Sequence, residues 1–267
     1  MQYSNTILGK IVKAPIKYSP DILHPIKRKK AKVDGRFFGV DDWVHYEMNW
    51  CDEKGCPQNA ILLISICADS SYIVESKSLK LYLNSFNFVK INKLDLVSTI
   101  VNDLAKILGD KPSVRLFSQA EWLLVYNKKH LDNVTILDNV IDEYVEVSDI
   151  CAEVLVPGEK SVVQRFVAHN FRSNCPVTGQ PDWATIVIDY DGVEVKESSL
   201  YRYLLSYRQH QGFHEQCVEQ IFADIFTYCE VDKLSVRGYF TRRGGLDINP
   251  FRSNFVRDSK LEFAVRQ

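Results

Sequence analysis

A thiol and a carboxylate lie close together in residues 173–183, which read Ser-Asn-Cys-Pro-Val-Thr-Gly-Gln-Pro-Asp-Trp. Cys175 lies in a segment punctuated by Pro and Gly, which predicts a loop. Asp182 comes at the start of an alternating run over residues 183–190, which predicts a strand. A thiol and a carboxylate held at one loop-to-strand junction can act as a nucleophile and its proton donor. Most free cysteines are instead small buried apolar residues, so this stretch alone favours a structural cysteine.

Two other groups of residues could bind a ligand. His214 and Glu215 open a predicted helix over residues 213–229, where a glutamate can also serve only to complement the helix dipole. The sequence Arg-Arg-Gly-Gly, which contains Arg243 and Gly244, predicts a tight cationic turn. Such a turn could hold phosphate through backbone N–H groups and guanidinium charge, or it could be an ordinary β-hairpin turn.

The composition excludes several classes of protein. Of 267 residues, 46% are hydrophobic and 25% charged, which is typical of globular proteins, and the net charge of -1 gives no global attraction to nucleic acid or membrane. The basic run at residues 27–32 is interpreted as a solvated surface loop. No stretch approaches about 20 apolar residues, and the N-terminus lacks a signal-peptide core. The seven unevenly spaced cysteines predict reduced thiols in the cytoplasm, and Cys51 and Cys56 lack the second ligand pair of a zinc site.

The chain contains a duplicated unit. Residues 79–86 (LKLYLNSF) align with residues 200–207 (LYRYLLSY), each pair lying 121 positions apart. The expected elements of the first copy are strands at 37–50 and 59–68, helices at 79–86 and 94–108 with Gly109 as the C-cap, and a strand at 113–117. Such repetition predicts two α+β units, each an antiparallel sheet with two helices on one face. The sequence therefore predicts an irregular arm (1–35), a first module (36–150) and a second module (151–267).

The two copies act as controls for each other. Cys217 and Cys229 correspond to leucines in the first copy, so both are predicted to be core residues, as is Cys67 in an apolar strand. Cys175 and Asp182 correspond to a lysine and an isoleucine, so this pair belongs to the second copy alone.

A polar segment is peculiar to the first copy. Glu75 and Lys77 correspond to a lysine and a serine in the second copy. Because each copy has polar residues that the other lacks, we expect one site to be assembled from both halves. No G-x-G-x-x-G or P-loop sequence is present, so a dinucleotide would not bind in a Rossmann crevice.

These residues together resemble the NADPH-dependent 7-cyano-7-deazaguanine reductases, the nitrile reductases of queuosine biosynthesis, in their long two-module bacterial form. The resemblance covers nearly the whole chain beyond the arm. It rests on the segment that begins Glu75-Ser-Lys-Ser-Leu-Lys-Leu-Tyr, the Cys175–Asp182 loop, Phe-His-Glu-Gln-Cys-Val-Glu at 213–219, and Tyr-Phe-Thr-Arg-Arg-Gly-Gly-Leu-Asp-Ile-Asn-Pro at 239–250.

The resemblance implies a fold, an assembly and a set of site residues. The fold is the tunnelling fold, in which antiparallel modules join into a barrel with sites between modules. The assembly is a homodimer that uses no metal ion and binds neither nucleic acid nor a membrane. Cys175 and Asp182 would be catalytic. The residues implied in substrate binding are Val74, Glu75, Ser76, His214 and Glu215, and those implied in NADPH binding are Ser76, Lys77, Arg243 and Gly244.

The implied reaction is the four-electron reduction of a nitrile to a primary amine with two NADPH. Cys175 would add to the nitrile carbon and form a covalent thioimide, with Asp182 as the proton donor. Glu215 would accept the two parallel donors of the deazaguanine edge, with Glu75 also near the base, and His214 would contact the substrate or relay a proton. Two other interpretations stay open: a relative in the same fold that acts on a pterin or purine without redox chemistry, and a catalytically silent module that binds a purine-like ligand.

Overall fold

The computed structural model describes residues 9, 12–32, 37–125, 134–140, 149–256, 260–262 and 267. Contacts divide the chain into two compact units. The first comprises Met1–Arg28, Asp42–Tyr126 and Arg243–Asp247, and the second comprises Lys29–Asp41, Asn127–Arg242 and Ile248–Gln267. This division differs from the contiguous modules expected from the sequence. Residues 29–41 and 127–150 belong to the second unit and residues 243–247 to the first, and two of the boundaries fall within strands β2 and β10.

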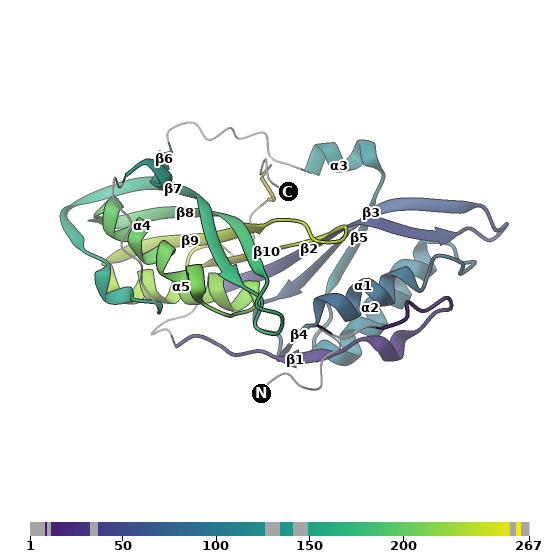
Figure 1. Ribbon diagram of the computed structural model, residues 1–267. Coiled ribbons are helices and arrows are strands. Elements are labelled where there is room, and N and C mark those ends of the chain that lie inside the picture. Colours follow the sequence, from purple (N-terminus) through teal and green to yellow (C-terminus); the bar gives the residue numbers. More distant parts are fainter. Residues whose placement is uncertain are drawn as a thin grey trace. The chain divides into compact units, whose positions relative to one another are not determined.

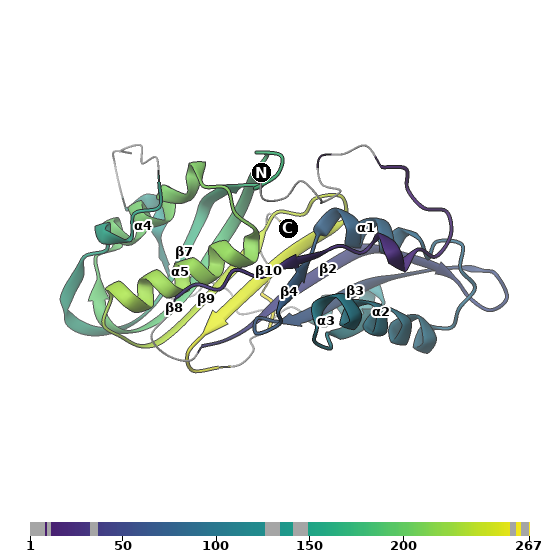
Figure 2. The same cartoon turned by 90° about the horizontal axis from the view of Figure 1, so that it is seen from below.

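The first unit is built from antiparallel strands and helices (Figures 1 and 2). Its elements are β1 (Pro25–Lys27), β2 (Phe38–Cys51, mostly in this unit), β3 (Pro57–Cys67), β4 (Tyr72–Val74), α1 (Ser76–Asn84), α2 (Lys93–Leu108), β5 (Ser113–Phe117) and α3 (Gln119–Val125). The strand order is β5-β3-β2, β3 and β5 pair antiparallel, and β1 pairs with β4. The predicted order of strands and helices is therefore confirmed.

The second unit repeats this arrangement with longer strands. Its elements are β6 (Thr135–Ile136), β7 (Pro157–Asn174), β8 (Pro181–Val195), α4 (Glu197–Leu205), α5 (His214–Tyr228), β9 (Val231–Phe240) and β10 (Leu246–Ser253, mostly in this unit). The strand order is β10-β9-β8-β7-β6, antiparallel except for the β6–β7 pair. Helices α4 and α5 cover one face of this sheet, and the main hydrophobic core lies beneath them (Figure 2).

Local sequence explains where the first-unit helices begin and end. Helix α1 starts three residues before the predicted helix, because the Glu75 carboxylate caps its N-terminus by accepting from the N–H groups of Lys77 and Ser78. Helix α2 ends at Gly109, whose φ of 72° is the left-handed conformation of the predicted C-cap. None of the described helices has the length and the apolar run that crossing a membrane requires.

Matching hydrogen bonds confirm the duplication. The Tyr82 hydroxyl donates to Asp103 Oδ2 at 2.9 Å in the first unit, and the Tyr203 hydroxyl donates to Asp224 Oδ2 at 2.6 Å in the second. Both tyrosines are fully buried and lie 121 positions apart, as do the two aspartates. Each pair joins the first helix of its unit to the second, so the same polar contact fixes the helix layer twice.

Part of the arm that was expected to be irregular belongs to the repeat. A 3-10 helix at Pro20–Ile22 precedes β1, and a second 3-10 helix at Ala152–Val154 precedes β7. The N–H of His24 donates to Ser78 Oγ at 3.1 Å, and the N–H of Val156 donates to Ser199 Oγ at 3.1 Å. Residues 19–25 are thus the structural counterpart of residues 151–157.

Replacing Tyr203 by phenylalanine is expected to lower the free energy of unfolding by about 1–3 kcal/mol, because it removes the hydroxyl from a buried carboxylate. Tyr82→Phe is expected to cost less, because Asp103 keeps two other donors, Tyr18 and Lys106, whereas Asp224 keeps one, Gln220. Urea denaturation measures both, with the exposed Tyr72→Phe as the matched control. Equal losses in all three variants would contradict a role of these contacts in holding the helices.

Candidate active site

The loop that carries Cys175 is the turn between β7 and β8. The Cys175 N–H donates to the Gln180 carbonyl at 2.8 Å, and the Gly179 N–H donates to the Cys175 carbonyl at 3.0 Å. The predicted loop is therefore confirmed. Cys175 is half-buried, whereas Cys217 and Cys229 are buried as predicted. Cys175 is thus a thiol that a ligand can reach on a well-defined backbone.

Asp182 lies near the start of β8 and is 6% exposed. It lies directly opposite the buried Ser173 of β7, so the two side chains share one face of the sheet. Cys175 follows the last residue of β7, Asn174, which pairs with Pro181 next to Asp182. The β7–β8 hairpin thus brings Cys175 and Asp182 to the same end of the two strands.

Helix α5 adds an imidazole and a second carboxylate to this face. His214 Nε2 lies 3.4 Å from Asp182 Oδ2. The His214 ring stacks on Phe240, with 3.8 Å between ring centroids and 7° between planes, which fixes the ring orientation. Glu215 lies in the first turn of α5 and is only 2% exposed, so it is more than a surface charge that complements the helix dipole. Asp182 and His214 are therefore in contact, and the charges of Asp182 and Glu215 both act on the Cys217 thiol of the same helix.

Asn174 fastens the Cys175 loop to the segment that leads into α5. Its N–H donates to the His210 carbonyl at 2.8 Å, and its carbonyl accepts from the Gly212 N–H at 3.1 Å. Its side-chain amide donates to the Arg208 carbonyl at 3.1 Å. No role was predicted for Asn174 or Phe240, because both act through packing and contacts with the backbone and not through reactive groups.

Cys217 is the second thiol in this region. Burial raises its pKa to about 12, and the charges of Asp182 and Glu215 raise it further, although a Ser173 contact acts in the opposite direction. Cys217 therefore stays protonated at neutral pH, and a thiol is a far weaker nucleophile than a thiolate. This contrast favours the half-buried Cys175 as the reactive residue.

The remaining cysteines differ in how far they are exposed. All seven cysteines are free thiols. The prediction of Cys67 as a core residue is wrong: it is exposed, because side chains alternate along β3 and the neighbouring Ile66 takes the core-facing position. Within the described ranges, no group of three or more His, Cys, Asp or Glu side chains could hold a metal ion.

The first unit holds the other predicted residues. Glu75 is fully buried, and its two carboxylate oxygens accept from the N–H groups of Lys77 at 2.7 Å and Ser78 at 2.9 Å. Burial raises its pKa, although these two hydrogen bonds act in the opposite direction. The cap was not predicted, but it leaves lone pairs on both oxygens for a further donor. Val74 is buried beside it, and Ser76 and Lys77 are half-buried.

The cationic turn is also part of the first unit. Arg243 and Leu246 exchange backbone hydrogen bonds of 2.9 and 3.2 Å, and φ is 55° at Gly244 and 77° at Gly245, which defines a type I′ hairpin turn. The hairpin interpretation is therefore confirmed. A Cβ atom on Gly244 would overlap the ammonium group of Lys80, so the lysine lies directly against the turn.

Lys77 and Lys80 are three residues apart on α1 and hence on neighbouring positions of one helix face. Together with Arg243 they give the first unit a cationic region with exposed backbone at Gly244, although the Glu47 carboxylate packs against the turn at Gly245. Such a region has the charge to attract phosphate groups.

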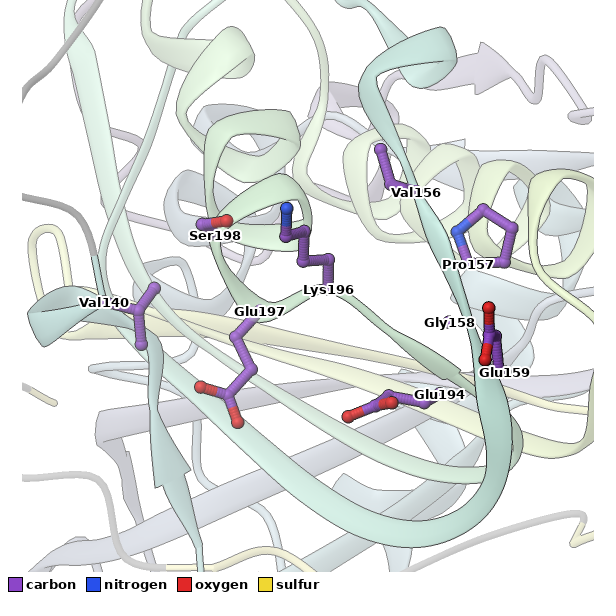
Figure 3. Close-up of a pocket in the computed structure, with 9 residues that line it drawn as sticks. All are labelled: Val140, Val156, Pro157, Gly158, Glu159, Glu194, Lys196, Glu197 and Ser198. Atoms are coloured by element: carbon purple, nitrogen blue, oxygen red, sulfur yellow. The ribbon is translucent and has the colours of Figure 1, made fainter.

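A pocket of about 620 Å³ lies elsewhere, in the second unit (Figure 3). It contains none of the predicted site residues. It is lined by Val140, Val156, Pro157, Gly158, Glu159, Glu194, Lys196, Glu197 and Ser198. Its Lys196–Ser198 edge is the repeat counterpart of Glu75–Lys77, and the Lys196 N–H donates to the Val156 carbonyl as the Glu75 N–H does to that of His24. The backbone hydrogen bond is thus repeated in the second unit, but the buried carboxylate of Glu75 is replaced by the side chain of Lys196.

Comparison with known families agrees with these two units. A family described as "Nitrile reductase, 7-cyano-7-deazaguanine-reductase N-term" matches residues 15–116, and one described as "QueF-like protein" matches residues 181–259. The first match covers most of the first unit, and the second covers the strands and helices that carry Asp182, His214 and Glu215. The class defined by these matches is that of the nitrile reductases.

Proteins named NADPH-dependent 7-cyano-7-deazaguanine reductase are similar over nearly the full length. That of Paraburkholderia phymatum is 42% identical over 259 residues, covering 93% of each chain. That of Colwellia psychrerythraea is 37% identical over 278 residues, covering 100% of this chain and 97% of its own. The chain therefore belongs to the family of NADPH-dependent 7-cyano-7-deazaguanine reductases.

Proposed function

We propose that the chain reduces the nitrile of 7-cyano-7-deazaguanine to the aminomethyl group of 7-aminomethyl-7-deazaguanine, with two NADPH, in the queuosine pathway of tRNA modification. The observation that carries this proposal is the cluster around α5. A half-buried thiol at Cys175 is fastened through Asn174 to the segment that leads into α5, and Asp182 at the start of β8 contacts His214 of that helix.

The first step would be addition of the Cys175 thiolate to the nitrile carbon. A carbon–sulfur bond forms, one carbon–nitrogen π bond breaks, and the electron pair moves to nitrogen, which takes a proton from Asp182. The product is a neutral covalent thioimide. His214 Nε2, 3.4 Å from Asp182, is placed to return a proton to that carboxylate.

Reduction would then proceed in two stages. NADPH, when bound, supplies one hydride to the substrate carbon, and a second molecule supplies the other after exchange. Between them the carbon–sulfur bond breaks, which returns the electron pair to Cys175 and leaves an imine. Asp182 and His214 would again supply protons to nitrogen, and the burial of this face would keep water from hydrolysing the imine.

The deazaguanine ring of the substrate would be held by carboxylates. Its N–H and amino groups present two parallel donors, which one carboxylate accepts as a fork. Glu215 is proposed as this anchor, with Glu75, Val74 and Ser76 also contacting the substrate. Because both carboxylates are nearly inaccessible to solvent, each hydrogen bond to them would be strong.

NADPH would bind the cationic region of the first unit. The proposed contacts are Ser76, Lys77, Arg243 and Gly244, and the position of Lys80 against the turn adds a further positive charge. We also propose that the chain has the tunnelling fold, forms a homodimer, uses no metal cofactor and acts in the cytoplasm. Light scattering in solution tests the dimer.

The activity is tested by mixing the protein with NADPH and the nitrile and following the loss of reduced cofactor in the near ultraviolet. Two NADPH should be consumed for each amine formed. Adduct formation at Cys175 without NADPH consumption would favour a relative without redox chemistry. No adduct and no consumption would favour a silent binding module.

Replacing Glu215 by glutamine is expected to weaken nitrile binding by about 1–3 kcal/mol, because a donor of the base would face an amide hydrogen. Titration calorimetry in a Cys175→Ala background isolates this non-covalent affinity. The matched control is Glu197→Gln, another first-turn glutamate of the second unit, which should leave the affinity unchanged. An unchanged affinity in Glu215→Gln would move the anchor role to Glu75.

A further inference from the structure

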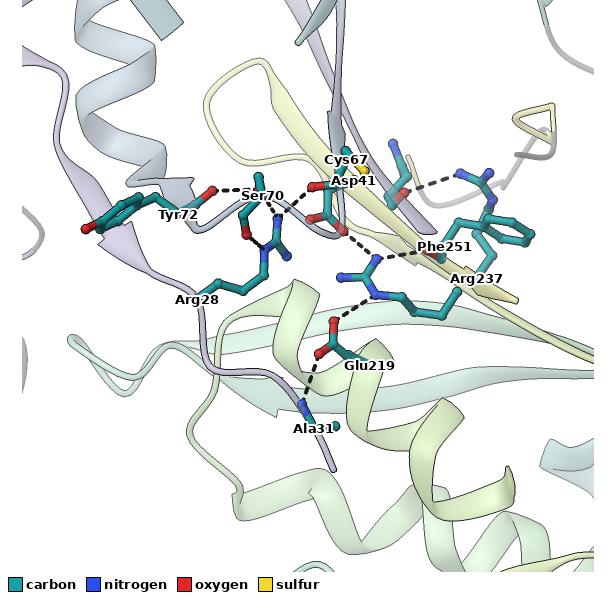
Figure 4. A network of polar contacts seen from close by, with 11 residues as sticks. Arg28, Ala31, Asp41, Cys67, Ser70, Tyr72, Glu219, Arg237 and Phe251 are labelled. Carbon is teal, nitrogen blue, oxygen red and sulfur yellow. Dashed lines mark hydrogen bonds and ion pairs between the residues drawn. The ribbon is translucent and has the colours of Figure 1, made fainter. Parts of the chain in front are cut away.

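A fully buried arginine joins two carboxylates in the second unit. Arg252 Nε lies 2.9 Å from Glu219 Oε2, and its Nη1 lies 2.7 Å from Asp41 Oδ1. Glu219 Oε1 also accepts from the Ala31 N–H at 3.0 Å (Figure 4). Arg252 and Asp41 are 0% exposed and Glu219 2%. Burial lowers the pKa of Arg252, but the two carboxylates outweigh this effect and raise it, so the guanidinium is charged.

Stability does not account for this network. Removing three charges from water is costly, and buried ion pairs can often be replaced by apolar residues without loss of stability. The first unit supplies a direct comparison, because the counterpart of Glu219 on α2 is Ser98, which is exposed. A helix at this place in the fold therefore forms without such a network.

The network lies one helical turn from the proposed substrate anchor. Glu219 follows Glu215 by four residues on α5, so both carboxylates lie on one face of the helix. In the first unit the counterpart of Glu215 is Leu94, which is 80% exposed. The buried anchor and the buried network thus occur together on α5 and are both absent from α2.

We propose that Arg252 and Glu219 are positioning residues, which fix the N-terminal half of α5 so that Glu215 meets the deazaguanine edge. Arg252 holds Glu219 from strand β10, and Ala31 holds it from the segment that precedes β2. This inference rests on the proposed function of Glu215.

A double-mutant cycle in the Cys175→Ala background tests the proposal. Glu219→Gln is expected to weaken binding of the nitrile about tenfold, within the range of indirect effects between neighbouring sites. Because Glu219 acts through Glu215, the Glu215→Gln/Glu219→Gln double variant should bind no more weakly than Glu215→Gln alone. Arg252→Lys should retain more of the affinity than Arg252→Met. NADPH affinity, measured by fluorescence, should change less than about twofold.

Asp224→Asn is the matched control, since Asp224 is another buried carboxylate of α5 but is bonded to Tyr203. It should lower the melting temperature and leave nitrile affinity unchanged. Additive effects in the cycle, or equal losses of nitrile and NADPH affinity that follow the melting temperature, would overturn the positioning role. Should Arg252→Met fail to fold, Glu219→Gln and Arg252→Lys still decide the question. An unchanged affinity in Glu215→Gln would instead overturn the anchor assignment, and with it this inference.

Discussion

Cys175→Ala is expected to abolish NADPH consumption and, in the same protein, the covalent adduct with the nitrile. A nitrile carbon is a modest electrophile, and without the thiolate no thioimide forms to accept hydride. Intact mass spectrometry after incubation with the nitrile alone measures the adduct directly. The parent protein should gain the mass of one substrate for each chain, and the variant should gain none.

The other cysteines provide the controls for this experiment. Cys67→Ala removes an exposed thiol and should leave both adduct and turnover intact. This result would show that the adduct does not come from unspecific reaction at a surface thiol. Cys217→Ala removes the buried thiol of α5, whose raised pKa keeps it protonated, and this variant should also retain the adduct. An adduct that persists in Cys175→Ala would refute the assignment of the nucleophile.

The duplication is the part of the fold that the sequence predicted best. Ile100 and Ile221 lie 121 positions apart and are both fully buried, because the two units bury the same face of the same helix. Helix ends set by a single residue, such as the left-handed Gly109, were also predictable from local sequence. The spacing of apolar residues and the residues that cap helices are local features, so they can be recognised in a single amino-acid sequence.

Contacts made by backbone groups could not be predicted in this way. Residues 19–25 and 151–157 occupy equivalent positions, yet they share only the leucine and the proline near their ends. The contacts that define them use the N–H and C=O groups of His24 and Val156, which any side chain allows. Side-chain patterns therefore gave no signal for this part of the arm.

The candidate site was predictable to the extent that its residues differ between the copies. Cys175 and Asp182 stood out because their counterparts have other chemistry, and the structure places both at the same end of the β7–β8 hairpin. The pairing of Arg252 with Asp41 and Glu219 joins residues far apart in the sequence, and no spacing rule connects them. Glu219 belongs to a motif that could be recognised in the sequence, but its pairing with Arg252 could not be predicted.

Asp182→Asn is expected to slow both adduct formation and turnover by about 10²–10⁴-fold, the usual contribution of a positioned general acid. Asparagine keeps the shape of the side chain but cannot donate an acidic proton to the nitrile nitrogen. Stopped-flow measurement of adduct formation separates this step from reduction. Non-covalent nitrile affinity, measured in the Cys175→Ala background, should change only slightly, because Asp182 is proposed to act on the reacting nitrogen and not on the base.

Asp189→Asn supplies the comparison on the same strand. Asp189 lies on β8 with a partly exposed carboxylate that contacts Arg165 and Ser235, away from His214, so turnover in Asp189→Asn should stay near that of the parent protein.

His214→Gln should slow turnover more than the first adduct-forming step, since the proposed role of His214 is to return protons to Asp182 between steps. Adduct formation in Asp182→Asn at the parent rate would show that another group protonates the nitrile nitrogen. In that case His214 would be the first residue to test, because it lies on the same face and its ring is held in place by Phe240.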